Sequence, residues 1–170
     1  MREYVRAGGT LSKLPLPSKA LYLGFLTLVV AAFITSFLLY YKGLGLTGAE
    51  AATHYLGNEH VPNPETFIVQ KSYIELLEIT HFHLYTQPVQ LLVLGHLFLL
   101  ARGGPWKFGV IVAAVLITIL HVVGPWMIWF GGPGFGWVMP VSGVAFLAIH
   151  LFLALWPLPD LLTPAPKKRP

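Results

Sequence analysis

Long apolar stretches, separated by Pro, Gly and charged residues, dominate the pattern of the chain. A helix needs about 20 mostly apolar residues to cross a bilayer. Four stretches meet that length, at residues 20–41, 73–100, 108–130 and 137–156. The pattern predicts an all-α integral membrane protein, with one four-helix bundle as the single membrane domain of residues 1–170.

The composition excludes soluble classes of protein. Apolar residues make up 55% of the chain and charged residues 11%, whereas a soluble domain carries roughly 25% charged residues. The chain has no cysteine, which excludes iron–sulfur clusters, thiolate catalysis, c-type haem attachment and cysteine zinc sites. We read the net charge of +4 as a sign of membrane topology, with the lipid bilayer and no nucleic acid as partner.

Lys and Arg are distributed unevenly between the ends and the connections. Nine lie in the N-terminal segment, in the connection with Arg102 and Lys107, and in the C-terminal tail. Only Lys42 and Lys71 lie in the connection of residues 42–72. Because cytoplasmic segments carry the excess of Lys and Arg, we predict that both termini are cytoplasmic and that residues 42–72 lie outside. The expected location is the bacterial inner (cytoplasmic) membrane, with a multi-pass topology.

Two polar positions predict helix starts. Thr47 and Glu50 have the spacing of a capping box, so a short helix is expected to run to about Tyr55. Ser18 is the expected N-cap of the first span.

Histidine is the main source of candidate chemistry. An ionisable side chain inside a bilayer is expensive and by default indicates a functional site. The alternative is a buried imidazole that only holds two helices together. Five of the seven histidines lie inside the predicted spans: His81, His83, His96, His121 and His150.

Helix geometry groups four of these histidines by depth. His81 and His96 share one stripe of the second span and lie about 22 Å apart along its axis. Counted from the helix ends, His121 matches the depth of His81, and His150 matches that of His96. We therefore predict two haem irons, an outer one held by His81 and His121 and an inner one held by His96 and His150. His83 lies about 200° from His81 and is the alternative outer ligand.

In its span plan and histidines, over residues 20–157, the chain resembles the di-haem cytochrome b membrane subunits of quinone-linked respiratory oxidoreductases. The resemblance implies two haems b, quinone as substrate, and a place in a larger membrane redox complex. The subunit would pass electrons between quinone or quinol and a partner redox subunit, as at most the quinone-reactive part of an enzyme. One departure is that a single helix supplies two ligands. Residues 75–83 also resemble a segment of small bacterial membrane proteins.

A quinol site needs a base near water, because quinol oxidation releases protons. Glu78, His83 and Tyr85 in the outer half of the second span are the candidates. The alternative role of Glu78 is to orient His81 or to cap the helix start.

Other interpretations compete with the haem prediction. Glu78 and His81 have the Glu-x-x-His spacing of a di-iron site, but the third and fourth spans contain no carboxylate. His81 and His83 would bind zinc or copper together only on an irregular helix. Glu78, His83, Gln87 and Gln90 could form a proton pathway. The alternative from a different class is a cofactor-free structural or assembly subunit of a membrane complex.

Overall fold

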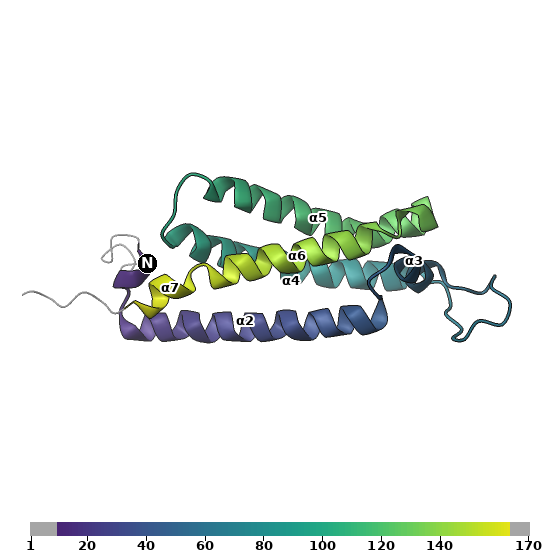
Figure 1. Cartoon of the computed structure of the whole chain (residues 1–170), viewed down its shortest axis with the longest axis horizontal. Helices are drawn as coiled ribbons and strands as arrows, with labels where there is room; N and C mark the ends of the chain where they lie inside the picture. The colour runs from purple at the N-terminus through teal and green to yellow at the C-terminus, as the bar shows by residue number, and fades with distance from the viewer. Residues whose placement is uncertain (1–9, 164–170) are drawn as a thin grey trace, which may run out of the picture.

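The computed structural model describes residues 10–163, and every regular element in that range is a helix. Four long helices lie lengthwise beside one another (Figure 1). The elements in chain order are η1 (Leu11–Lys13), α2 (Leu16–Gly43), α3 (Gly48–Leu56), α4 (Tyr73–Leu100), α5 (Lys107–Gly131), η2 (Pro133–Phe135), α6 (Val138–Leu155) and α7 (Leu158–Leu162).

The four long helices cover the four predicted spans to within a few residues at each end. The first begins earlier than predicted, with Pro15 rather than Ser18 at the N-cap. Pro17 is tolerated in the first turn because the backbone N–H that it lacks would have no partner there. The predicted capping box is confirmed, since Thr47 accepts from the Glu50 backbone N–H while Glu50 accepts from the Thr47 backbone N–H.

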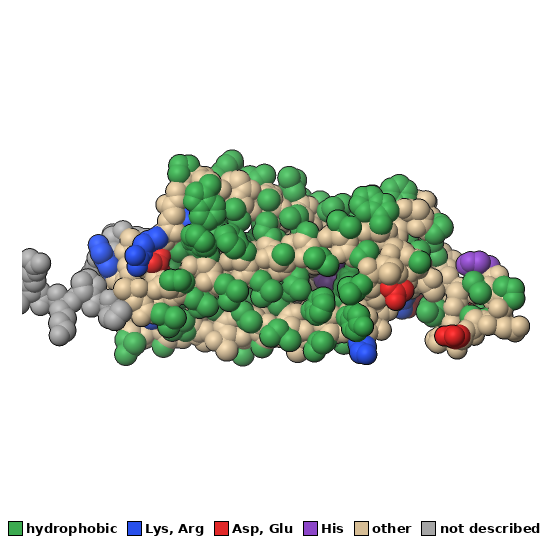
Figure 2. Space-filling model, in the orientation of Figure 1, with side chains coloured by type: hydrophobic (Ala, Val, Ile, Leu, Met, Phe, Trp, Pro, Cys, Tyr) green, Lys and Arg blue, Asp and Glu red, His purple; other side chains and the backbone are tan. Residues whose placement is uncertain are grey.

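Three segments of the described chain are long and apolar enough to cross a membrane: α2, α5 and the segment Pro133–Leu162 that contains α6. Apolar side chains cover the length of the molecule (Figure 2). This is a membrane protein whose helices contact lipid. Helix α4 is as long as α2, with 28 residues each, but is not among these segments, because it carries more polar residues.

Helix α6 is the centre of the arrangement, since it packs against α2, α4 and α5. Helix α5 also packs against α4. In the described chain, α2 rests on α6 and α7 without a comparable contact to α4. Space is therefore left between α2 and α4, over the face of α6.

Two apolar cores hold the two ends of the molecule. The core near η1 and α7 includes Leu26, Phe98 and Leu153. The core near α3 includes Tyr55 and Ile128. Along α4, α5 and α6, the polar residues described below lie between these cores.

The end that holds η1 and α7 is closed by polar contacts, and most Lys and Arg side chains visible in Figure 2 gather there. Lys19 donates to the Ser12 carbonyl oxygen at 2.8 Å. Arg102 Nε pairs with Asp160 Oδ1 at 2.5 Å. Lys107 donates to carbonyl oxygens in the last turn of α4, including that of Phe98 at 2.8 Å. These cations are used to close the helix ends.

Candidate functional site

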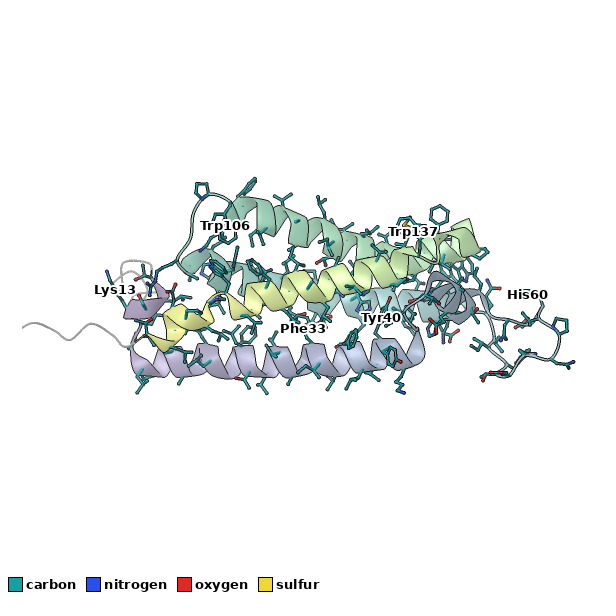
Figure 3. The ribbon with its side chains drawn as sticks, viewed as in Figure 1. Lys13, Phe33, Tyr40, His60, Trp106 and Trp137 are labelled. Atoms are coloured by element: carbon teal, nitrogen blue, oxygen red, sulfur yellow. The ribbon has the colours of Figure 1, made fainter. Side chains whose placement is uncertain are left out.

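A cavity of about 480 Å³ lies between α2, α4, α5 and α6. It fills the space where α2 and α4 do not meet. Phe33 and Tyr40 reach from α2 toward α6 on one side of it (Figure 3). Its wall is mostly apolar, with these polar residues: Ser36, Tyr40, His83, Thr86, Gln87, Gln90 and His121.

Two histidines from different helices meet at this cavity. The ring centroids of His83 on α4 and His121 on α5 lie 6.1 Å apart, with 44° between the ring planes. His121 is 9% exposed, and His83 is half-buried. On α4, Gln87 and Gln90 follow His83 at helical spacing and line the same wall. The polar stripe of His83, Gln87 and Gln90 therefore faces the interior.

Ser142 on α6 fixes the ring of His121. Ser142 Oγ lies 3.2 Å from His121 Nδ1 and donates to the Met139 carbonyl oxygen at 3.3 Å. A hydroxyl has one hydrogen to donate, so Ser142 accepts from Nδ1–H of His121. The Nε2 of His121 then keeps its lone pair. This is the arrangement of a metal-binding histidine, whose other ring nitrogen donates to a partner in the protein.

An aromatic stack joins His121 to His150. Phe146 stacks on His121 with ring centroids 5.1 Å apart, and on His150 with centroids 3.9 Å apart. His150 is fully buried, and its Nδ1 lies 2.9 Å from the Phe146 carbonyl oxygen, to which it donates. The stack connects the cavity to the core around α2, because Phe33 also contacts both Phe146 and His150.

Three buried polar atoms in the described chain have no hydrogen-bond partner: Tyr40 Oη, Gln87 Oε1 and His150 Nε2. Leaving such a group unsatisfied costs about 1–3 kcal/mol. Tyr40 and Gln87 line the cavity, and Gln87 is 6% exposed. Unsatisfied groups on a cavity wall indicate a site that is completed by water, an ion or a ligand.

The structure does not form the two pairs that depth predicted. His81 and His96 lie on the exposed face of α4, turned away from His121 and His150. His83 is the histidine of α4 that faces His121. His150 also lies closer to His121 than depth predicted, because Phe146 stacks on both rings, with centroids 5.1 Å and 3.9 Å away. Depth says nothing about rotation, and α4 presents its other polar stripe to α5 and α6.

The three residues of the predicted proton site also lie on two different faces of α4. Glu78 and Tyr85 are exposed on the outer face of α4, with Tyr85 76% exposed. Only His83 of the three candidates lines the cavity.

Three residues of the site were not predicted: Tyr40, Ser142 and Phe146. Ser142 had a sequence signal, because it and His150 are the only polar side chains of α6. Tyr40 had none, since aromatic residues are common near span ends. The close approach of Tyr40 depends on Gly143, where an added Cβ would lie 3.0 Å from the Tyr40 ring.

A family described as a transmembrane helical domain matches residues 45–169, which covers α3 to α7 and every site residue except those of α2. No curated protein and no solved structure matches the chain.

Proposed function

This chain belongs to that family of transmembrane helical domains, and we propose that it is a membrane electron-transfer subunit that binds haem b between His83 and His121. The observation that carries the proposal is the facing pair of imidazoles on the wall of a mostly apolar cavity. The proposal keeps the predicted chemistry, moves the outer ligand from His81 to His83, and has one haem site within a chain.

The residues present fit this group. A metal–imidazole bond is about 2 Å long and the ring centre lies about 1 Å beyond the nitrogen, so two imidazoles on one metal have centroids about 6 Å apart. The observed separation is 6.1 Å. Ser142 leaves Nε2 of His121 available for a bond to iron. The apolar wall of the cavity suits a porphyrin, and the unsatisfied Tyr40 hydroxyl suits its polar substituents.

Each part of the site has a defined task in this proposal. Haem iron held by two imidazoles supplies one-electron transfer, with no open position for oxygen. Ser142 orients His121 and sets its tautomer. Phe146 keeps water away from the inner side of His121 and fixes the ring plane by stacking. The short outer segment has no room for a catalytic domain, so the electrons would pass to or from a partner redox subunit and quinone.

We further propose that α4 completes a four-helix membrane bundle with both termini in the cytoplasm of a bacterial cell. Its support is the length of α4 and its packing against α5 and α6. The end with η1 and α7 also carries Lys19, Arg102 and Lys107, as expected of a cytoplasmic end.

The test is the haem content of the purified full chain, measured from its reduced absorbance bands. We expect one haem b per chain, and we expect His83→Ala and His121→Ala each to abolish or convert those bands. His81→Ala is the matched control, because it removes an imidazole from the same helix on its exposed face. A wild-type chain without haem would leave the cofactor-free structural subunit as the better explanation.

Quinol binding in the same cavity is the second candidate, and the unsatisfied Tyr40 Oη and Gln87 Oε1 favour it. A quinone carbonyl accepts from a hydroxyl, and a quinol hydroxyl donates to an amide oxygen. If the chain lacks haem, a short-tailed quinol should raise its melting temperature, and Gln87→Leu should abolish that rise. A chain that holds haem and shows no rise excludes this candidate.

A further inference from the structure

The exposed face of α4 carries a stripe of polar side chains, which we call the α4 stripe: Glu78, His81 and Tyr85. All three are exposed. They fall within an arc of about 60° at 100° per residue. The opposite face of α4 holds the buried Leu76, Gln87 and Leu94. The stripe is therefore on the side of α4 that no other helix of the described chain covers.

The stripe runs inward from the membrane–water interface. At one end of α4, the Tyr73 ring contacts Trp126 with centroids 5.5 Å apart, and such aromatic clusters mark the membrane–water interface. At the other end, Trp106 and Trp156 lie with centroids 5.1 Å apart. The Trp126 indole also donates to Thr80 Oγ1 at 2.7 Å, so Glu78 and His81 lie at the inner edge of the first cluster and Tyr85 lies further in.

Lipid is a poor environment for this face. A carboxylate or an imidazole within the hydrocarbon region costs several kcal/mol, so such residues face protein or water. This agrees with the absence of α4 from the apolar segments of the described chain, which include the other three long helices. A protein surface or water must therefore lie against the stripe within the membrane.

We propose that the α4 stripe is the interface between two copies of this chain, related by a two-fold axis along the membrane normal. Such an axis places residues of equal depth opposite each other in two parallel α4 helices. Glu78 and His81 are one turn apart on one face, about 4.5 Å along the axis. The carboxylate of each copy can then accept from the imidazole of the other, on both sides of the axis.

Charge complementarity favours a second copy over an unrelated subunit. The stripe contains its own acceptor, Glu78, and its own donors, His81 and the Tyr85 hydroxyl. Two such stripes satisfy each other, whereas a face with one sign of charge would need a partner of the opposite sign. Interhelical hydrogen bonds of this kind hold membrane helices together.

Cysteine cross-linking tests the interface, and the natural chain has no cysteine to interfere. Leu92 is 71% exposed on the same face of α4. We expect Leu92→Cys and Tyr85→Cys to form disulfide-linked dimers when the full chain is oxidised in native membranes. Leu28→Cys on α2 and Leu116→Cys on α5 are the matched controls, at 73% and 60% exposure on faces without a carboxylate or a histidine.

A second measurement asks whether Glu78 and His81 hold the dimer. Native mass spectrometry in lipid nanodiscs should find a dimer for the wild type and a shift toward monomer for Glu78→Leu. Glu59→Leu, on the exposed outer connection, should leave the dimer intact. The proposal is overturned if Leu92→Cys gives no dimer, if it cross-links only to a different protein, or if the controls cross-link equally well. None of these readouts depends on haem, so this proposal and the proposed function can fail separately.

Discussion

The ammonium group of Lys107, the first residue of α5, lies 2.8 Å from the carbonyl oxygen of Phe98 in the last turn of α4. It also donates to the Ala101 carbonyl oxygen and lies 5.2 Å from the centre of the Phe98 ring. The last carbonyls of a helix have no partner within the helix. One lysine thus caps α4 and fixes the turn that joins it to α5.

Replacing Lys107 by Met should lower stability by about 1–3 kcal/mol, because the buried carbonyls lose their donor. The free energy of unfolding in a denaturing detergent titration measures the loss. Lys42→Met is the control, since Lys42 is exposed and its ammonium group lies over the Tyr41 ring. Equal stability of the two variants would show that the cap contributes nothing.

Ser142→Ala should weaken haem binding by about 10- to 100-fold, because the hydrogen bond that orients a histidine ligand is lost. Haem titration of the apoprotein measures this change, and Ser142→Thr should restore part of the affinity. Thr118→Ala provides the comparison, because Thr118 lies on the same helix as His121. Its buried hydroxyl donates to the Ala114 carbonyl oxygen and not to a histidine. If both alanine variants bind haem equally well, Ser142 has no positioning role.

Thr47→Ala should lower the free energy of opening α3 by about 1 kcal/mol, which is the usual contribution of an N-cap side chain. Hydrogen exchange of the α3 amides reports this opening. The Thr47 hydroxyl also donates to the Glu50 carboxylate, and this hydrogen bond is the largest cause of the lowered pKa of Glu50. Because the pKa of Glu50 is lowered by folding, its ionised carboxylate stabilises α3 fully above the ordinary pKa of glutamate. This stabilisation is lost as the pH falls through the pKa that Glu50 has in the folded chain. The wild type should therefore lose α3 protection in acid, and Thr47→Ala should lose less.

His54 gives α3 a second pH dependence, at higher pH. Burial lowers the pKa of His54, partly opposed by the hydrogen bond to the Gly43 carbonyl oxygen at 2.8 Å. The unfolded segment binds a proton more readily than the folded one, so the stability of α3 is complete above about pH 6.5 and falls below it. His54→Gln should flatten the hydrogen-exchange profile of α3 between about pH 5 and 7. An unchanged profile would assign the dependence to another group.

Membrane topology can be measured in intact cells with an impermeant thiol reagent. Glu59→Cys, in the outer connection, should be labelled, and Gly104→Cys, between α4 and α5, should be labelled only after lysis. The reason is the excess of Lys and Arg at the end that holds Gly104. The reverse pattern would invert the topology.

The sequence alone was sufficient to predict the helices. Each long helix needs only a run of apolar residues with breakers at its ends, and such runs satisfy their own backbone hydrogen bonds wherever they pack. The capping box at Thr47 and Glu50 is equally local, because both bonds form within four residues. The position of each residue along its own helix is local as well, since the rise per residue is fixed.

Only the tertiary structure decided which face of α4 turns inward. His81 and His83 are only two residues apart in sequence but lie about 200° apart around the helix, and both stripes of α4 are polar. In a membrane, apolar residues face lipid as readily as they face other helices, so the hydrophobic pattern does not identify the inner side. Packing against α5 and α6 placed His83 beside His121 and Ser142 behind it. It left His81 and Glu78 outside because the side chains that fit α5 and α6 lie on the opposite face of α4.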